Sequence, residues 1–333
     1  MPEPGTDAWL DQVKEAIIDP DLPIVDSHHH LWTRNAQVYE VEQLLADTRS
    51  GHNVIKTVYM ECGSRYREEG PDHMKAVAET EFVVKQAERA RELGGSKIAG
   101  IVSHADLRLG EDVVEVLEAH EEAGSGLFRG IRHAGAWMEE PFPFGKSARD
   151  GAEDLYDRSD FRTGVKVLGR LGLTYDTYHY HNRNKDYARL ARSVPDTQLV
   201  FNHFGTPVGV GHYADKRQEV FDRWIEDIAE IAECDNVVAK IGGLAMPVNG
   251  FGWDVRDTPA SSDEFVEAQR PYFLHAIECF GIERCMMESN FPVDRNSLSY
   301  HVLFNGLKKI VLDFSDDEKH QLFHRTAERV YNI

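Results

Sequence analysis

Short apolar runs alternate with longer amphipathic segments along the chain, and this alternation predicts a repeated strand–helix order. Runs rich in β-branched and aliphatic residues are typical of buried parallel strands. Eight such runs lie at residues 24–28, 54–61, 97–103, 127–132, 173–179, 198–203, 236–241 and 284–290. Apolar residues with a period near 3.6 predict helices at residues 72–93, 111–122, 185–193, 217–233, 263–280 and 316–330. His120 lies mid-helix among glutamates and is expected on the solvated surface.

Eight strand–helix units favour one closed barrel. Single α/β barrels commonly reach about 250 residues, or more with insertions, so the 333 residues fit one such unit. No linker rich in Pro, Gly and Ser divides the chain. We therefore expect a distorted (β/α)8 barrel over residues 23–333, preceded by an N-terminal helical arm at residues 1–22.

Composition and charge narrow the class of protein. No segment approaches the roughly 18 apolar residues of a membrane span, and the first residues lack the basic start and apolar core of a secretory signal. The four cysteines form no CxxC pair, which suits a reducing cytoplasm. A net charge of −20 repels nucleic acid and anionic membranes, although local arginines can still bind a small anion. These features predict a cytoplasmic protein that binds neither nucleic acid nor membrane.

The segment IVDSHHHLW, at residues 24–32, runs from an apolar strand into three histidines. Successive side chains on a strand alternate between its faces, so His28 and His30 should point the same way and His29 the other way. Two neutral imidazoles at one strand end can hold a metal ion such as zinc. The alternative is a polar strand end without an ion.

Polar residues lie at or just after the end of each of the eight predicted strands. In a barrel of this kind, catalytic groups lie at the carboxyl ends of the strands. The polar residues are His28 and His30, Glu61, His104, Arg132 and His133, His179 and His181, His203, Lys240 and Asn290. Loops rich in Gly, Pro and aromatic residues follow at residues 134–160, 204–216 and 242–262. The pattern predicts a partly enclosed pocket for a small organic molecule on this rim.

Five motifs between about residues 22 and 331 resemble the amidohydrolase-related branch of the amidohydrolase superfamily. They are DSHHHLW, FRGIRH, YDTYHYH, LVFNHFGTP and RCMMESNFPVD. This branch contains sugar-lactone and pyrone-dicarboxylate lactonases and metal-dependent decarboxylases. The resemblance implies a distorted barrel and a hydrolase or lyase that acts on a small carboxylated or cyclic ester substrate.

The resemblance also implies a set of metal ligands. His28 and His30 match the first-strand ligands of a divalent metal, for which zinc is favoured. The fifth-strand ligand would be His181, nearer the mouth of the strand, or His179. If His181 is the ligand, His179 and Tyr180 would instead line the pocket and contact the substrate.

The remaining motifs imply residues that bind or activate the substrate. His203 matches a residue that serves as a second-site ligand or as an acid/base. Arg132 resembles a clamp for a carboxylate or a lactone carbonyl, because its planar fork suits two oxygen acceptors. The alternative is an ion pair between Arg132 and Glu139 or Glu140 that holds the loop after strand four. Lys240 and Glu61 are further candidates for substrate binding, with a buried salt bridge and a polar rim position as their alternatives.

Strand eight departs from the family pattern. The family usually places a metal-binding aspartate before the aromatic–Pro pair, where this chain has Asn290. An amide cannot take a proton from water and is a weaker, neutral ligand, so metal occupancy is left open. Asp294, Glu288 or His203 could then act as the base, and the sequence does not choose between them.

The combined pattern predicts a hydrolase that opens a small cyclic ester with activated water. The first alternative is a non-oxidative decarboxylase of a small unsaturated or aromatic acid. Asn290 argues against it, because in the family that chemistry depends on the strand-eight carboxylate. The second alternative is a barrel that binds a ligand without turning it over. A homo-oligomer formed through barrel helices is compatible with the sequence, but no pattern specifies one.

Overall fold

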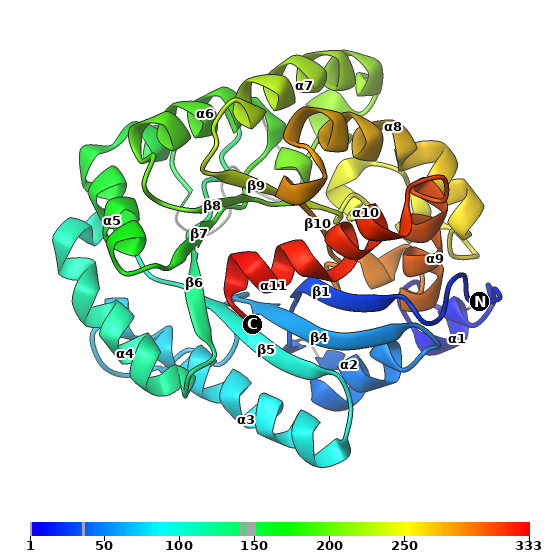
Figure 1. Cartoon of the computed structure of the whole chain (residues 1–333), viewed down its shortest axis with the longest axis horizontal. Helices are drawn as coiled ribbons and strands as arrows, with labels where there is room; N and C mark the ends of the chain where they lie inside the picture. Colours follow the sequence, from blue (N-terminus) through cyan, green and yellow to red (C-terminus); the bar gives the residue numbers. More distant parts are fainter. Residues whose placement is uncertain (1, 35–36, 140–142, 144–150) are drawn as a thin grey trace.

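The computed structural model describes residues 2–34, 37–139, 143 and 151–333. Eight parallel strands form one sheet in the order β1-β4-β5-β6-β7-β8-β9-β10, curled into a barrel (Figure 1). The strands are β1 (Pro23–His29), β4 (Asn53–Met60), β5 (Lys97–Ser103), β6 (Phe128–Arg132), β7 (Thr174–Asp176), β8 (Leu199–Phe201), β9 (Val237–Ile241) and β10 (Cys285–Met287). The predicted (β/α)8 barrel is thereby confirmed.

The segment that follows β10 closes the barrel against β1. The Asn290 amide donates a hydrogen bond of 2.9 Å to the His28 carbonyl. The His30 amide in turn donates one of 2.7 Å to the Phe291 carbonyl. The polar residues that follow β10 therefore lie directly beside the histidines at the end of β1.

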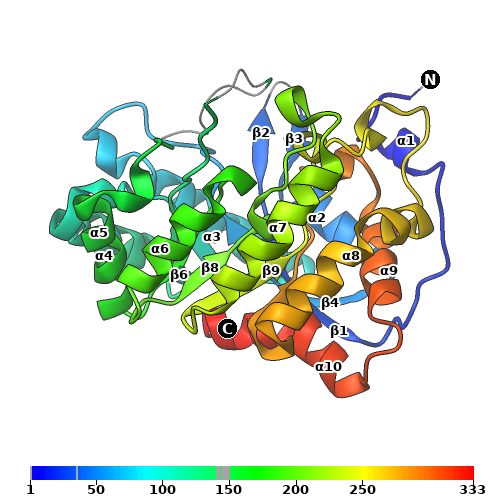
Figure 2. The same cartoon turned by 90° about the horizontal axis from the view of Figure 1, so that it is seen from above.

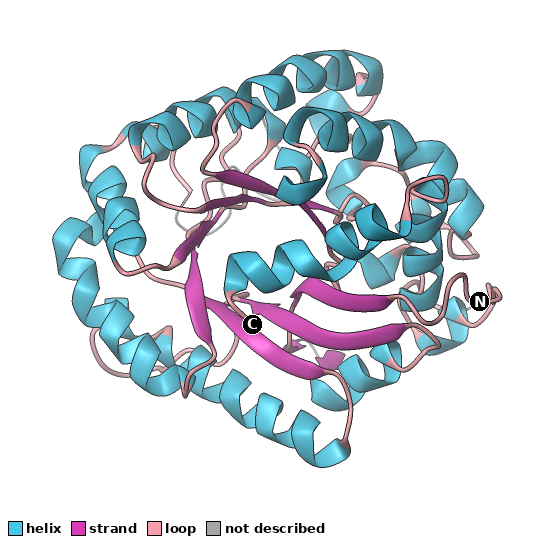
Figure 3. Cartoon of the chain, in the orientation of Figure 1, coloured by secondary structure: helices cyan, strands magenta, loops and turns pink. Residues whose placement is uncertain are grey.

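Helices surround the barrel on the outside (Figure 3). They are α2 (Val41–Thr48), α3 (Val77–Leu93), α4 (Val114–Gly124), α5 (Ser159–Arg170), α6 (Asn184–Ser193), α7 (Arg217–Ala232), α8 (Ser262–Phe280) and α9 (Tyr300–Ile310). The largest hydrophobic cluster contains buried residues of helices and strands alike, such as Val83 of α3 and Ile101 of β5. Burial of this apolar surface holds the helical layer on the barrel. Helix α8 begins at a capping box, in which the Ser261 hydroxyl accepts from the Glu264 amide.

Shorter elements complete the chain. A two-stranded ribbon, β2 (Trp32–Arg34) and β3 (Gln37–Tyr39), follows β1. The 3₁₀ turns are Asp72–Met74, Leu107–Val113, Leu155–Asp157, His181–Arg183, His203–Gly205, Gly211–Tyr213, Pro247–Asn249, Trp253–Val255, Ile282–Arg284 and Asp294–Asn296. Within the described ranges, no helix is both long and apolar enough to cross a membrane.

A C-terminal helix closes one end of the barrel. It comprises α10 (Asp316–His320), a π-helical turn (Gln321–Arg325) and α11 (Thr326–Tyr331), and α11 lies across the opening in Figure 1. Tyr331 is buried and donates a hydrogen bond of 2.7 Å to Asp176. Figure 2 shows this helix and the β2–β3 ribbon at opposite ends of the molecule. The helix thus covers the barrel opening at its own end, and the ribbon lies at the other end.

The N-terminal arm contains one short helix, α1 (Asp7–Leu10), and otherwise runs without regular structure to β1. Trp9 anchors it through a hydrogen bond of 3.0 Å to the Arg256 carbonyl. Further along, the Lys308 ammonium donates to the carbonyls of Ile18 and Asp19 at 3.1 and 2.6 Å. The arm predicted as helical thus has only four residues in an α-helix among those described, and tertiary contacts hold the rest.

The prediction of a solvated His120 is wrong. Its side chain is fully buried, with Nδ1 at 2.9 Å from the Thr80 hydroxyl and Nε2 at 2.9 Å from the His104 carbonyl. The neighbouring glutamates suggested an exposed face. One position of that helix, however, turns inward against α3 and the end of β5.

Candidate active site

A cavity of about 260 Å³ opens where the carboxyl ends of the strands meet. It brings together five residues that the sequence singled out: His30, Glu61, Arg132, His203 and Asn290. The other lining residues are Trp32, Arg34, Cys62, Ala134, Tyr178, Met246 and Val293. The aromatic and aliphatic walls with a few convergent polar groups are typical of a site for a small organic molecule.

His28 and His30 face each other, as strand alternation predicts. Their Nε2 atoms lie 3.2 Å apart, and His29 packs on the opposite side against Tyr59. The Nδ1–H of His30 donates a hydrogen bond of 2.8 Å to the Met60 carbonyl, which leaves its Nε2 with a lone pair. Burial lowers the pKa of both imidazoles well below the usual value. Both rings are therefore neutral, the form that binds metals.

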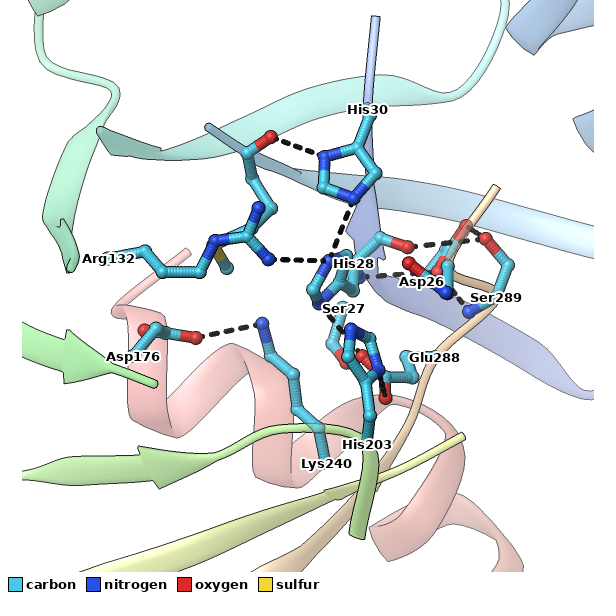
Figure 4. A network of polar contacts seen from close by, with 12 residues as sticks. Asp26, Ser27, His28, His30, Arg132, Asp176, His203, Lys240, Glu288 and Ser289 are labelled. Carbon is cyan, nitrogen blue, oxygen red and sulfur yellow. Dashed lines mark hydrogen bonds and ion pairs between the residues drawn. The ribbon is translucent and has the colours of Figure 1, made fainter. Parts of the chain in front are cut away.

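Glu288 lies between His28 and His203 (Figure 4). Its Oε1 atom is 2.7 Å from Nδ1 of His203, and its Oε2 atom is 2.9 Å from Nδ1 of His28. All three side chains are buried. The sequence offered Glu288 as one of three candidate bases. It lies behind the lining, but it contacts two site histidines at once.

Two adjacent glycines make room for this carboxylate. A Cβ atom at Gly242 would lie 2.5 Å from Cγ of Glu288, and one at Gly243 would lie 2.1 Å from Nδ1 of His203. Gly243 also has a φ of +69°, which disfavours other residues. The side chains that pack against this glycine pair are those of Glu288 and His203.

The donor set around Glu288 fits a metal ion. His28, His203 and Glu288 each offer a ligand atom, and these atoms lie within 4.8 Å of one another. Within the described part of the chain, Nδ1 of His28 and Oε2 of Glu288 are buried without a hydrogen bond, although 2.9 Å apart. Leaving buried polar atoms unsatisfied is costly, and imidazole and carboxylate are zinc ligands. A divalent cation would satisfy both atoms.

Arg132 is paired with Glu61. Its Nε donates to Oε1 of Glu61 at 2.8 Å, and its Nη2 donates to the Glu61 carbonyl. Its Nη1 lies 3.4 Å from Nε2 of His28. Of the two residues considered in the sequence, Glu140 is outside the described ranges. Glu61 thus orients the guanidinium, which still lines the cavity.

Lys240 lies inside the barrel and takes part in a buried ion pair. Its Nζ is 3.0 Å from Oδ1 of Asp176, and both side chains have no exposed surface. Tyr331 donates to the same carboxylate oxygen at 2.7 Å. Lys240 is absent from the described lining of the cavity. The salt-bridge alternative that the sequence left open accounts for these contacts.

The structure does not bring His179, His181 or Tyr180 into the described lining of the cavity. The His179 ring is bonded on both nitrogens, to Tyr156, Thr177 and Asn184, each at 3.0 Å. His181 accepts from the Val208 amide at 3.2 Å and packs against Tyr213. Because β7 ends at Asp176, strand alternation no longer applies to these positions.

Tyr178, which the sequence did not select, is the residue of this segment that reaches the cavity. Its ring centroid lies 6.1 Å from that of His203 and 6.0 Å from Cζ of Arg132. Its only sequence signal was its place in a tyrosine-rich run after strand five. The ring forms an aromatic wall between the two polar groups.

Asn290 faces the cavity and Asp294 lies behind it. The Asn290 amide nitrogen donates to Oδ1 of Asp294 at 2.8 Å, and the Ala245 amide donates to Oδ2 at 3.2 Å. Asp294 is fully buried, and burial raises the pKa of its carboxyl well above the usual range. Asp294, a candidate base in the sequence, therefore orients Asn290 and is absent from the described lining of the cavity.

Solved structures share this fold. A zinc-bound amidohydrolase from Burkholderia multivorans aligns with a TM-score of 0.72 at 21% identity, covering 93% of this chain and 99% of that chain. A candidate 2-pyrone-4,6-dicarboxylic acid hydrolase from Pseudomonas putida gives 0.62 at 16% identity, covering 93% and 98%. A manganese-bound 5-carboxyvanillate decarboxylase from Novosphingobium aromaticivorans gives 0.60 at 11% identity, covering 95% and 97%.

Sequence comparison gives the family. An uncharacterized protein of Sinorhizobium fredii, y4mH, is 30% identical over 336 residues, covering 94% of this chain and 99% of the relative. The family model described as amidohydrolase matches residues 25–333, which includes every strand of the barrel except the first residues of β1. With its cavity at the strand ends and its buried histidine–carboxylate cluster, this chain belongs to the amidohydrolase family.

Proposed function

We propose that this protein is a hydrolase that opens a small lactone, with the Glu288–His203 pair activating the attacking water. The observation that carries the proposal is the 2.7 Å contact between Oε1 of Glu288 and Nδ1 of His203, with the His203 ring on the cavity wall. A buried carboxylate that holds one ring nitrogen leaves the other nitrogen free as a base. In this proposal the carboxylate that takes part in catalysis is that of Glu288, and Asp294 has no catalytic role.

The proton transfers follow from this arrangement. Water attacks the lactone carbonyl carbon while Nε2 of His203 takes its proton, and the resulting imidazolium is stabilised by Glu288 through Nδ1–H. When the ring C–O bond breaks, the same proton passes from Nε2 to the leaving alkoxide. The product is a hydroxy acid, and His203 returns to its neutral form.

Arg132 supports the proposal as the group that stabilises negative charge on the carbonyl oxygen. Glu61 accepts from its Nε and Nη2 and so fixes the plane of the guanidinium. A guanidinium has five N–H donors, so further N–H bonds remain for a substrate oxygen. Fixed cationic donors at a developing oxyanion are worth several kcal/mol, on the order of 3. Asn290 would provide a further polar group on the cavity wall.

A divalent metal fits beside this pair. It would be held by His28 and by Glu288, next to His203, whose Nε2 stays free to act as the base. When bound, it would polarise the carbonyl and lower the pKa of water. Zinc is our preferred ion, because imidazole and carboxylate are its usual ligands.

We further propose a cytoplasmic setting and a small carboxylated or cyclic ester substrate. The four cysteines are free, and three of them are buried, which suits a reducing compartment. The cavity of about 260 Å³ suits a substrate of one ring and a few substituents.

Acid release from a panel of γ- and δ-lactones, with and without a carboxylate, tests the proposal. Replacing His203→Gln should lower kcat by about 100-fold or more, the usual contribution of a general base. His275→Gln, on α8 and bonded to the Ile225 carbonyl, is the matched control and should leave kcat unchanged. Carbon dioxide release without acid release, or full activity in His203→Gln, would overturn the proposal.

A further inference from the structure

Two histidines of the C-terminal helix contact each other through their ring nitrogens. His320 and His324 are four residues apart, so their side chains lie on one helix face. Nδ1 of His320 is 2.9 Å from Nε2 of His324, and the two rings are nearly perpendicular at 88°. The two ring nitrogens therefore face each other at hydrogen-bond distance, and a metal ion could take the place of the shared proton.

A carboxylate fixes the orientation of one of these rings. Nδ1–H of His324 donates to Oε2 of Glu328 at 3.1 Å, and the other oxygen of Glu328 accepts from Lys56 at 2.7 Å. The lone pair of His324 is thereby placed on Nε2, facing His320. His30 shows the same arrangement in the cavity, with Nδ1 held by the Met60 carbonyl and Nε2 facing His28. Metal-binding histidines usually have such a support on the second nitrogen.

The backbone at this histidine pair and the cavity beside it also favour a metal site. The π-helical turn at Gln321–Arg325 begins directly after His320 and contains His324, and such turns are frequent at functional sites. His320 also borders a cavity of about 220 Å³. Its other lining residues are Asp19, Asp21, Leu22, Asp316 and Lys319. Three carboxylates against one ammonium favour a cation in this cavity beside His320.

We propose that His320 and His324 form a second metal site, for a zinc-class dication. Imidazole pairs bind Zn²⁺, Ni²⁺ and Cu²⁺ much better than Mg²⁺ or Ca²⁺, which prefer oxygen ligands. Glu328 supports His324 without contacting the ion, and water completes the coordination. An ion at this position joins α10 to the π-helical turn in the helix that closes the barrel. The site is independent of the proposed lactone hydrolysis.

Zn²⁺ titration of the metal-free full-length chain by calorimetry, with elemental analysis after dialysis, tests this site. We expect His320→Gln and His324→Gln each to remove one equivalent of bound zinc and to leave the equivalent that depends on Glu288. His73→Gln, a partly exposed histidine of another segment, is the matched control and should keep both equivalents. Mg²⁺ at the same concentrations should release no site-specific heat.

Glu328→Gln keeps both ligands and tests the supporting role separately. We expect it to weaken this equivalent by about 10- to 100-fold. Thermal melts without metal check that each variant is folded. Zn²⁺ should raise the Tm of the wild type more than that of His324→Gln. Unchanged zinc stoichiometry and affinity in both histidine variants, or a wild type whose bound zinc is removed entirely by Glu288→Gln, would overturn the proposal.

Discussion

Oε1 of Glu288 lies 2.7 Å from Nδ1 of His203, behind the cavity wall that His203 forms. The same carboxylate contacts His28 through Oε2 at 2.9 Å. The carboxylate that is missing at position 290 is thus present two residues earlier, directed between two histidines. This relationship favours the Glu288–His203 pair over Asp294 as the source of the base.

The first prediction separates the two carboxylates near His203. Glu288→Gln should lower kcat by about 100-fold or more, because His203 loses the partner that stabilises its charged form. Asp294→Asn should affect the free energy of unfolding more than kcat, since Asp294 contacts Asn290 and the Ala245 amide and does not line the cavity. Steady-state kinetics on the same lactone would check both. A larger loss of kcat in Asp294→Asn would contradict the assignment.

The second prediction concerns Asn290→Asp. The new carboxylate would lie about where the amide now bonds Asp294 at 2.8 Å, so two carboxylates would compete for one proton. Their pKa in the folded state would rise above the unfolded value. The folded protein would then hold more protons than the unfolded chain, and its stability would fall as pH rises above about 4.

Chemical denaturation of the metal-free Asn290→Asp variant at pH 5 and pH 8 measures this effect. We expect a loss of about 1–3 kcal/mol relative to wild type, larger at pH 8. Added Zn²⁺ should raise the Tm of this variant more than that of the wild type, because a negative ligand has been gained. Equal losses at the two pH values would show that the two carboxylates are not coupled.

The third prediction tests Lys240 as a structural residue. Lys240→Met leaves Asp176 buried beside Tyr331 without its cation, and breaking a buried pair in this way typically costs about 3–5 kcal/mol. The double variant Lys240→Met/Asp176→Asn should lose less. KM for the lactone should change little in any folded variant. A large rise in KM at unchanged stability would instead support the substrate-binding role that the sequence suggested.

The fourth prediction concerns the N-terminal arm. Burial lowers the pKa of Lys308 to about 8. Between this value and the unfolded value near 10.4, the folded state holds fewer protons than the unfolded chain. The contribution of Lys308 to stability should therefore increase as pH rises through that window.

Comparison with Lys308→Met isolates this contribution. The free energy of unfolding of wild type minus that of the variant should increase by on the order of 2 kcal/mol between pH 7.5 and pH 10. Urea denaturation at several pH values measures it. Parallel pH curves for the two proteins would show that the ammonium is not desolvated in its contacts with Ile18 and Asp19.

Local patterns were reliable where a single strand decided the geometry. Alternation along β1 placed His28 and His30 together and His29 against Tyr59. Alternation failed after β7, because the ladder ends at Asp176 and the following residues leave the strand. His179 and His181 therefore face other partners, and Tyr178 takes the place at the cavity.

The sequence by itself determined the barrel, the rim that carries the site, and the polar residues at its strand ends. Those properties depend on periodicity and strand order, which are local and repeated along the chain. The tertiary structure alone decided which of these residues meet. Closure of the barrel sets the segment after β10 against β1 and places Glu288 between His28 and His203. Residues some 260 positions apart are joined by that closure, and no spacing within one segment encodes their distance.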